Sequence, residues 1–281
     1  MMKLVCEISQ SLADALAARA AASGESTSHI VMSALADALG VDHATLFQVS
    51  TSTALVQGVY QEAVTVGDLK QHGDFGLGTF VDLDGEMVAV DGRFFQIPGT
   101  GPTREAADRD AVPFAVVTTF HPNRETCLKA VTSFDDLTRQ LDLLRGSNNL
   151  FYAVRLDGWF AVVHTRAVCK VEPGVSLVDA AHAQAEFDFT DVDGTIVGFW
   201  TPTYAKTLNI AGWHLHFLTA ARDGGGHLLQ LQAQDLKVQV QHLDDFRMAI
   251  PETANFLQAD LTGDPTQALD QAERQSHGGL T

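Results

Sequence analysis

The sequence predicts an α+β protein in which two domains built on mixed or antiparallel β-sheets, with a few helices, follow a small N-terminal β-α-α module. Short runs of β-branched and aromatic residues recur from residue 46 onward, and several are joined by Asp-Gly turns, which are typical of hairpins. Helical spacing of apolar residues is clearest before residue 45. A chain of 281 residues with 46% hydrophobic residues is also long enough for two ordinary domains.

Residues 1–45 are expected to form a separate unit with a strand at 3–8 and helices at 11–23 and 28–39. This order resembles a ribbon-helix-helix module, a fold of intertwined dimers that often reads DNA with basic residues. Residues 1–42 carry two basic and five acidic side chains, which disfavours contacts with phosphate. A dimerisation appendage is therefore the favoured interpretation, and a DNA reader is the alternative.

The rest of the chain is expected to form an N-terminal β-rich domain at 46–172 and a C-terminal β-rich domain at 173–281. Val171-Glu172-Pro173-Gly174 is the predicted linker, because proline and glycine break both helices and strands. In the first domain the expected strands are 46–50, 81–83, 86–90, 93–97, 113–120, 150–155 and 159–166, and the expected helical segments are 66–71 and 133–144. In the second, a helix at 177–185 and strands at 187–189, 194–200 and 236–240 surround a histidine hairpin at 213–227.

Composition and charge exclude several classes of function. The formal net charge of −17 argues against binding to nucleic acid or to an anionic membrane surface. No apolar run is long enough to cross a membrane, and Glu7 and Asp14 interrupt the apolar start that an export signal needs, so a cytoplasmic protein is expected. The three cysteines lack C-x-x-C spacing and are expected to be reduced thiols. There is no glycine-rich nucleotide-binding motif.

Three histidines form the expected metal site. His214 and His216 point to one face of a strand, because successive side chains alternate between faces. The glycine-rich turn at 222–226 then reverses the chain, which brings His227 opposite His216. Three imidazoles with a position left open are the ligand set of catalytic zinc, so one Zn²⁺ per chain is expected. The alternative is a surface hairpin whose histidines alternate by chance.

Five longer motifs connect the chain with a known family. They are HGDFGLGTF at 72–80, LDGEM at 83–87, FYAVRLDG at 151–158, GTIVGFWTP at 194–202 and GWHLHF at 212–217. These motifs resemble the α-acetolactate decarboxylase family, and the match runs in order from about Thr45 to the C-terminus. The resemblance implies a zinc-dependent carboxy-lyase that converts 2-acetolactate to acetoin and carbon dioxide, in the acetoin and butanediol branch of pyruvate metabolism.

The resemblance also assigns roles to individual residues. It implies that His214, His216 and His227 are the metal ligands. It further implies that Glu86, Arg166 and Glu273 act beside the metal, and that Thr79 and Arg166 contact the substrate. Glu273 is fixed only by its place in the C-terminal tail, where no strong motif anchors the alignment.

The chemistry of the reaction is consistent with these residues. Acetolactate is a β-keto acid, so loss of carbon dioxide leaves an enolate whose oxyanion must be stabilised. A divalent metal can do this as a Lewis acid, so no thiamine or pyridoxal phosphate is expected. Glu86 is the candidate acid that protonates carbon, and Arg166 the candidate partner of the substrate carboxylate. Without the resemblance, Glu86 could be a solvated turn residue and Arg166 part of a structural ion pair.

Other interpretations stay open at this point. His164 shares a face with Arg166 and is interpreted as structural, and four further histidines are expected on the surface or in loops: His72, His121, His182 and His242. Another three-histidine zinc lyase or hydrolase, a cupin-like metal enzyme, and an acidic ligand-sensing regulator using residues 1–45 are the alternative functions. The expected partners are a small anionic 2-hydroxy-3-keto acid and a second copy of the chain in a homodimer, with no nucleic acid and no membrane.

Overall fold

A computed structural model describes residues 5–23, 26–39, 44–61, 63–172 and 174–274. Its contacts divide the chain into two compact units, Met1–His43 and Ala44–Thr281. This boundary lies close to the one expected at residue 45. The expected second boundary at 172/173 is not found, because both main sheets of the larger unit take strands from each side of that point.

The smaller unit contains two helices, α1 (Gln10–Ser23) and α2 (Thr27–Leu39), close to the expected positions. The hydroxyl of Ser9 accepts a hydrogen bond from the backbone nitrogen of Leu12 at 3.3 Å, so the first helix begins slightly earlier than expected. Residues 5–8 do not form part of a strand, and the start of the expected strand lies outside the described residues. A ribbon strand of this kind pairs with its copy in a second chain, so a single chain does not test it.

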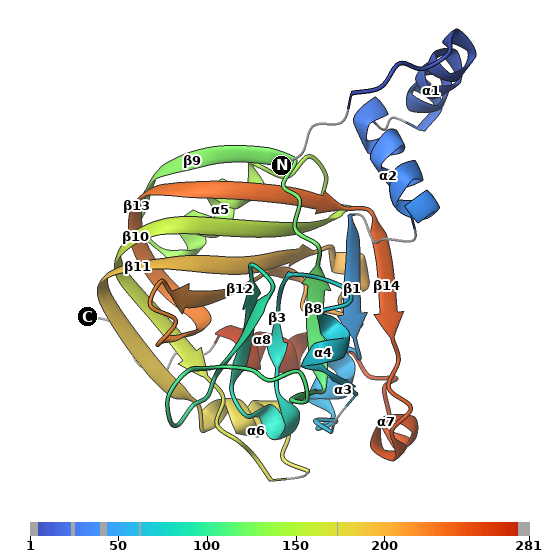
Figure 1. The fold of residues 1–281 in the computed structure, drawn as a ribbon. Helices are drawn as coiled ribbons and strands as arrows, with labels where there is room; N and C mark the ends of the chain where they lie inside the picture. The colour runs from blue at the N-terminus through green and yellow to red at the C-terminus, as the bar shows by residue number, and fades with distance from the viewer. Residues whose placement is uncertain (1–4, 24–25, 40–43, 62, 173, 275–281) are drawn as a thin grey trace. The chain divides into compact units, whose positions relative to one another are not determined.

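A seven-stranded sheet forms one layer of the larger unit (Figure 1). All neighbouring strands are antiparallel except β1 and β14, which are parallel. In spatial order the strands are β14 (Asp245–Ala249), β1 (Thr45–Val49), β8 (Phe114–Thr118), β3 (Phe75–Thr79), β4 (Glu86–Val90), β5 (Arg93–Ile97) and β6 (Arg104–Glu105). A separate pair is formed by β2 (Val64–Thr65) and β7 (Ala111–Val112).

The prediction of a strand at 81–83 is wrong. Val81–Leu83 forms a short 3-10 helix, η1, in which Asp82 and Leu83 have left-handed φ values of 59° and 55°. Such a backbone cannot extend a sheet ladder, so β4 pairs instead with β3, with Thr79 opposite Glu86. The Asp84-Gly85 turn therefore lies between η1 and β4.

A second sheet contains the longest strands, β10 (Phe151–Ala167), β11 (Ala185–Thr201) and β13 (Gly225–Leu243), together with β12 (Gly212–Thr219) and β9 (Arg124–Val131). The pairs β10–β11, β11–β12, β12–β13 and β13–β10 close a ring. The strand β9 pairs with a later part of β13, residues 233–240. The long strands curve strongly to close it (Figure 1).

Two of the long strands are continuous where the sequence analysis predicted two separate strands each. The segments 150–155 and 159–166 are one strand, β10, and 187–189 and 194–200 are one strand, β11. Gly158 and Gly194, which lie at these expected breaks, are opposite each other inside the ladder. A Cβ on Gly194 would lie 2.3 Å from the ring of Phe217, so glycine is needed there for close packing rather than for a turn.

Three apolar clusters hold these layers together. One lies between the two sheets and includes Leu77 and Val88 from the seven-stranded sheet and Val197 and Phe199 from the ring. A second fills the ring and includes Leu215, which alternates with the histidines of β12. A third covers the other face of the seven-stranded sheet. The outward face of the ring is therefore the one that meets the seven-stranded sheet.

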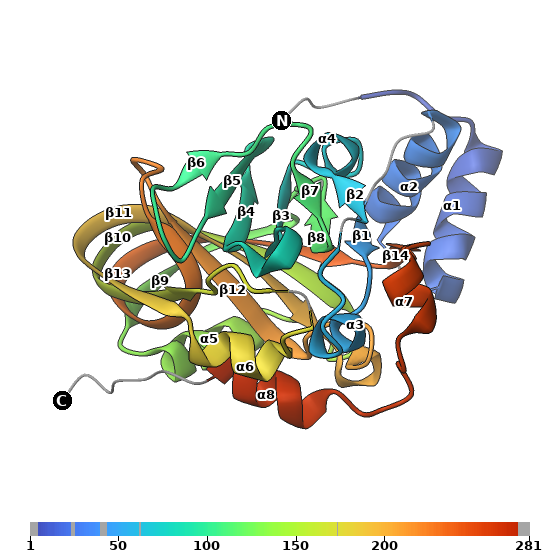
Figure 2. The same cartoon turned by 90° about the horizontal axis from the view of Figure 1, so that it is seen from below.

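The helices of the larger unit are short. Three of them contact one another at one end of the layers: α3 (Ser52–Val56), α6 (Leu177–His182) and α8 (Thr266–Arg274), the last two lying side by side in Figure 2. The others are α4 (Val66–Leu69), α5 (Phe134–Asp142), α7 (Ala254–Gln258) and the 3-10 segment η2 (Thr203–Ala205). Of the helices described, none has the length and apolar character needed to cross a membrane.

Candidate active site

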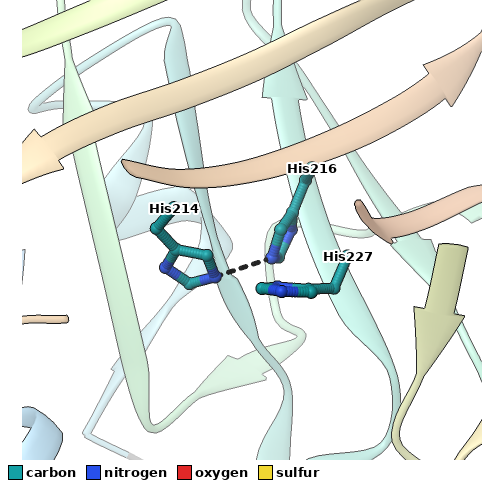
Figure 3. Close-up of side chains that lie close together, drawn as sticks. All are labelled: His214, His216 and His227. Carbon is teal, nitrogen blue, oxygen red and sulfur yellow. Dashed lines mark hydrogen bonds between the residues drawn. The ribbon is translucent and has the colours of Figure 1, made fainter. Parts of the chain in front are cut away.

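His214, His216 and His227 converge on one point (Figure 3). All three side chains are buried, and one nitrogen atom from each lies within 4.8 Å of the other two. The Nε2 atoms of His214 and His216 are 3.1 Å apart. Two ligands about 2.0–2.1 Å from a tetrahedral zinc ion would be separated by about 3.3 Å, so this spacing fits a shared metal.

The hairpin places these residues as the sequence predicts. β12 ends at Thr219, β13 begins at Gly225, and His216 lies directly opposite His227. Gly226 has a φ of 133°, and a Cβ there would lie 2.5 Å from the carbonyl oxygen of Arg166. The expected cross-strand pairing is therefore confirmed. The interpretation of a surface hairpin is wrong, because the imidazoles are buried.

The protonation of the imidazoles suits a metal. Nδ1 of His216 donates to the backbone carbonyl of Met87 at 2.9 Å, because a carbonyl oxygen can only accept, and this leaves Nε2 to face the cluster. Burial, with a smaller contribution from the charge of Arg166, lowers the pKa of His214 to about 3. His214 is therefore neutral at physiological pH, as a ligand must be.

Arg166 lies in the neighbouring strand of the ring, directly opposite His227. Its side chain is only 3% exposed. Since residues opposite each other share a face of a sheet, the guanidinium lies on the same side as the imidazoles. Arg166 thus reaches the cluster from β10, a strand that lies before the histidine hairpin in the chain.

Glu86 and Thr79 come from the other sheet. Glu86 is 7% exposed, with Oε2 3.5 Å from Nε2 of His216 and Oε1 3.8 Å from Nη1 of Arg166. The Thr79 hydroxyl donates to the carbonyl of Gly85 at 2.8 Å, which ties β3 to the turn before Glu86. The solvated-turn interpretation of Glu86 is therefore wrong.

Two cavities meet at the cluster. The inner one, of about 40 Å³, is lined by Thr79, Glu86, Arg166 and His214 and by apolar side chains of α3, α6 and α8. The outer one, of about 610 Å³, opens beside His214 and His227. A small molecule in the inner cavity would contact the three polar candidates and the cluster at once, in largely apolar surroundings.

The remaining candidates lie away from the cluster or outside the described residues. Glu273 belongs to the last turn of α8, but its side chain lies outside the described part of the chain. His164 contacts Asp188 and Glu186 rather than the cluster. The four histidines expected on the surface or in loops are half-buried or exposed: His72, His121, His182 and His242. Glu186, which the sequence did not single out, lies opposite Arg166 in the β10–β11 ladder.

Comparison with known proteins relates the chain to one enzyme family. A sequence model of the alpha-acetolactate decarboxylase family matches residues 46–263. The alpha-acetolactate decarboxylase of Brevibacillus brevis is 42% identical over 81% of this chain and 80% of its own length, and that of Methanosarcina mazei is 41% identical over 82% and 80%. The crystal structure of alpha-acetolactate decarboxylase from Bacillus subtilis strain 168 covers 82% of this chain and 100% of its own, with 35% identity and a TM-score of 0.79.

Proposed function

The chain belongs to the alpha-acetolactate decarboxylase family, and we propose that it converts 2-acetolactate to acetoin and carbon dioxide with one divalent metal ion held by His214, His216 and His227. The observation that carries this proposal is the buried cluster of three imidazoles beside a carboxylate and a guanidinium. Neither neighbour comes from the same hairpin as the histidines.

The donor set supports a catalytic metal rather than a structural one. Three neutral imidazoles leave a coordination position open, and the choice of nitrogen ligands suits Zn²⁺. When bound, the ion would supply Lewis-acid stabilisation of the oxygen that gains charge as carbon dioxide is lost. The histidines would hold it, and the Met87 carbonyl would orient His216.

The other polar residues of the site have separate proposed roles. Arg166 is the proposed partner of the substrate carboxylate, because a buried guanidinium presents paired N–H groups to two carboxylate oxygens. Glu86 is the proposed donor of the proton to carbon. Thr79 holds the turn before Glu86 and lines the cavity, and the apolar walls of that cavity exclude water. Glu273 stays a proposed participant.

The finer sequence-based expectations are proposals as well. Zinc is the proposed metal, and the acetoin and butanediol branch of pyruvate metabolism in the cytoplasm is the proposed setting. Residues 1–45 are proposed to promote self-association into a homodimer. Their two helices form a unit too small to bury a core of its own, which makes a partner physically reasonable.

Acetoin formation tests the proposal directly. The purified full-length chain is incubated with racemic 2-acetolactate before and after dialysis against a chelator, and Zn²⁺ is then added back. We expect acetoin from the untreated protein, loss of it after chelation, and recovery on addition of the ion. Full activity after removal of all metal would contradict the metal-dependent proposal, and no acetoin from metal-loaded protein would contradict the decarboxylase proposal.

A further inference from the structure

The outer cavity has no role yet in the proposed reaction, although it opens beside the histidine cluster. Its volume is about 610 Å³, within the range of about 300–1,000 Å³ that sites for small molecules occupy. His214 and Ile210 line both this cavity and the inner one, so the two cavities adjoin at the cluster. A molecule bound at the cluster can therefore extend into both.

The inner cavity is too small for a whole acetolactate ion. A water molecule needs about 10–15 Å³ of such a cavity, so the volume of about 40 Å³ accommodates about three groups of that size. The three non-hydrogen atoms of a carboxylate match this capacity, and Arg166 in the wall is the proposed partner of the substrate carboxylate. The larger, uncharged part of the substrate then lies past His214 in the outer cavity.

The charges around the outer cavity favour the same orientation. Apart from its histidines, the charged residues of its described lining are one cation and three acids: Lys206, Asp135, Asp142 and Asp270. The ammonium of Lys206 is paired with Asp264 at 2.8 Å. Acidic side chains repel an anion but not an uncharged group. The substrate is therefore favoured with its carboxylate inward and its uncharged end in the outer cavity.

One wall of the outer cavity is held in place before any ligand binds. Oδ1 of Asp142, at the end of α5, accepts from Nε1 of Trp213 at 2.8 Å and from Nη2 of Arg145 at 2.7 Å. The Cζ atom of Arg145 lies 3.4 Å from the ring centre of Trp200. Both tryptophans line the cavity. Their rings give a preformed apolar surface against which a hydrocarbon or aryl group can pack.

We propose that this protein decarboxylates 2-hydroxy-3-keto acids whose uncharged end is much larger than a methyl group, aryl-substituted ones included, because that end binds in the outer cavity. This inference rests on the proposed function and names a wider substrate class for the same site. The substrate anion takes up one proton and yields a hydroxy ketone and carbon dioxide. The bond from C2 to the carboxylate breaks, its electron pair passes to the ketone oxygen, and a C–H bond forms at C2, so no further reactant is needed.

The turnover test uses acetolactate and two isomers in which a phenyl group replaces a hydrogen of one or the other methyl group. These are 2-benzyl-2-hydroxy-3-oxobutanoate and 2-hydroxy-2-methyl-3-oxo-4-phenylbutanoate, and release of carbon dioxide by the metal-loaded full-length protein is measured. We expect kcat/KM for at least one isomer to lie within about tenfold of the value for acetolactate. A pocket without room rejects even one additional methylene group by about 10–200-fold.

Two variants narrow the outer cavity from different sides. Thr138 in α5 and Ala211 before β12 are half-buried residues that line this cavity and not the inner one, so Thr138→Trp and Ala211→Phe are used. We expect each to lower kcat/KM for the accepted phenyl isomer by roughly ten- to a hundredfold more than for acetolactate. Arg139→Trp is the matched control, because Arg139 is the next residue of α5, is exposed and lines neither cavity. It should leave the ratio of the two kcat/KM values unchanged.

A binding measurement tests the cavity without turnover. Calorimetry compares the Kd of 2-hydroxyisobutyrate with that of 2-hydroxy-2-methyl-3-phenylpropanoate, which carries the additional ring. Both keep the carboxylate and tertiary hydroxyl but have no ketone and cannot decarboxylate. We expect the phenyl compound to bind at least as tightly, because its ring loses contact with water in the outer cavity. Thr138→Trp should raise its Kd by roughly tenfold more than that of 2-hydroxyisobutyrate.

The contrary results are distinct. Turnover of both phenyl isomers at less than about one hundredth of the acetolactate value would overturn the inference and leave the proposed function intact. An equal loss for all substrates in the narrowed variants would also overturn it, because the outer cavity would then be only a route to the cluster. If the wild type makes no acetoin, the proposed function fails. The outer cavity would then remain the site of the aryl group only if Thr138→Trp selectively weakens binding of the phenyl compound.

Discussion

Replacing Glu86 by glutamine removes a buried negative charge while keeping the size of the side chain. The carboxylate lies 3.5 Å from His216 and 3.8 Å from Arg166, at the wall of the inner cavity. A carboxamide in this place still accepts a hydrogen bond but cannot deliver an acidic proton. A positioned general acid is worth about 10²–10⁴-fold, so we expect Glu86→Gln to lower acetoin formation by a factor in that range.

The same variant should keep its fold and its metal. The three imidazoles are untouched, and the amide oxygen still faces the Arg166 guanidinium. We therefore expect the free energy of unfolding to fall by about 3 kcal/mol at most. Thermal unfolding and metal analysis measure these quantities. Glu105→Gln is the matched control. Glu105 is an exposed carboxylate paired with Arg93, and its loss should leave turnover unchanged.

Acetoin yield and the handedness of the product are measured together, because a proton delivered from one fixed side chain reaches one face of the enediolate. Turnover close to that of the wild type, with unchanged handedness, would refute the assignment of Glu86. The proton would then come from elsewhere, and Glu273 would be the next residue to replace. A loss of metal in Glu86→Gln would instead make Glu86 part of the metal-binding set.

Three further predictions concern the metal, the N-terminal unit and the turn before Glu86. His216→Ala removes one of the three proposed ligands and the bond to Met87, so we expect metal analysis to show less than stoichiometric metal and activity to be lost. A chain that starts at Thr45 contains both sheets, so it should remain active while light scattering shows weaker self-association. Gly85→Ala should lower the free energy of unfolding by more than about 2 kcal/mol, because φ is 86° and the added Cβ would lie 2.3 Å from the carbonyl of Ile97.

Each of these has a clear contrary result. Stoichiometric metal with unchanged affinity in His216→Ala would show that the imidazole is not a ligand. Tight DNA binding by the full chain at physiological salt, absent from the shortened chain, would favour the regulator interpretation. Gly92→Ala is the control for Gly85, because its φ is also positive, at 74°, but among the described residues no atom beyond its two chain neighbours lies within 4 Å of the added Cβ. Equal destabilisation of both variants would attribute the effect to backbone conformation alone.

Local patterns in the sequence were sufficient to predict the histidine cluster of the candidate site. Strand alternation places His214 and His216 on one face, and the glycine-rich turn brings His227 opposite His216, all within a hairpin of neighbouring residues. The helices of the N-terminal unit were likewise predictable, because the periodicity of a helix is set by residues three and four positions apart.

The position of every other group depended on contacts between distant parts of the chain. Glu86 belongs to one sheet and Arg166 to the other, and only the packing of the sheets brings them within 3.8 Å. The parallel pairing of β1 with β14 joins residues 200 positions apart, and the glycines that resemble strand ends lie inside continuous strands. Such pairings are decided by the free energy of the whole packed chain rather than by local propensity. The sequence by itself therefore determined the histidine hairpin, and the tertiary structure decided that Glu86 and Arg166 lie beside it.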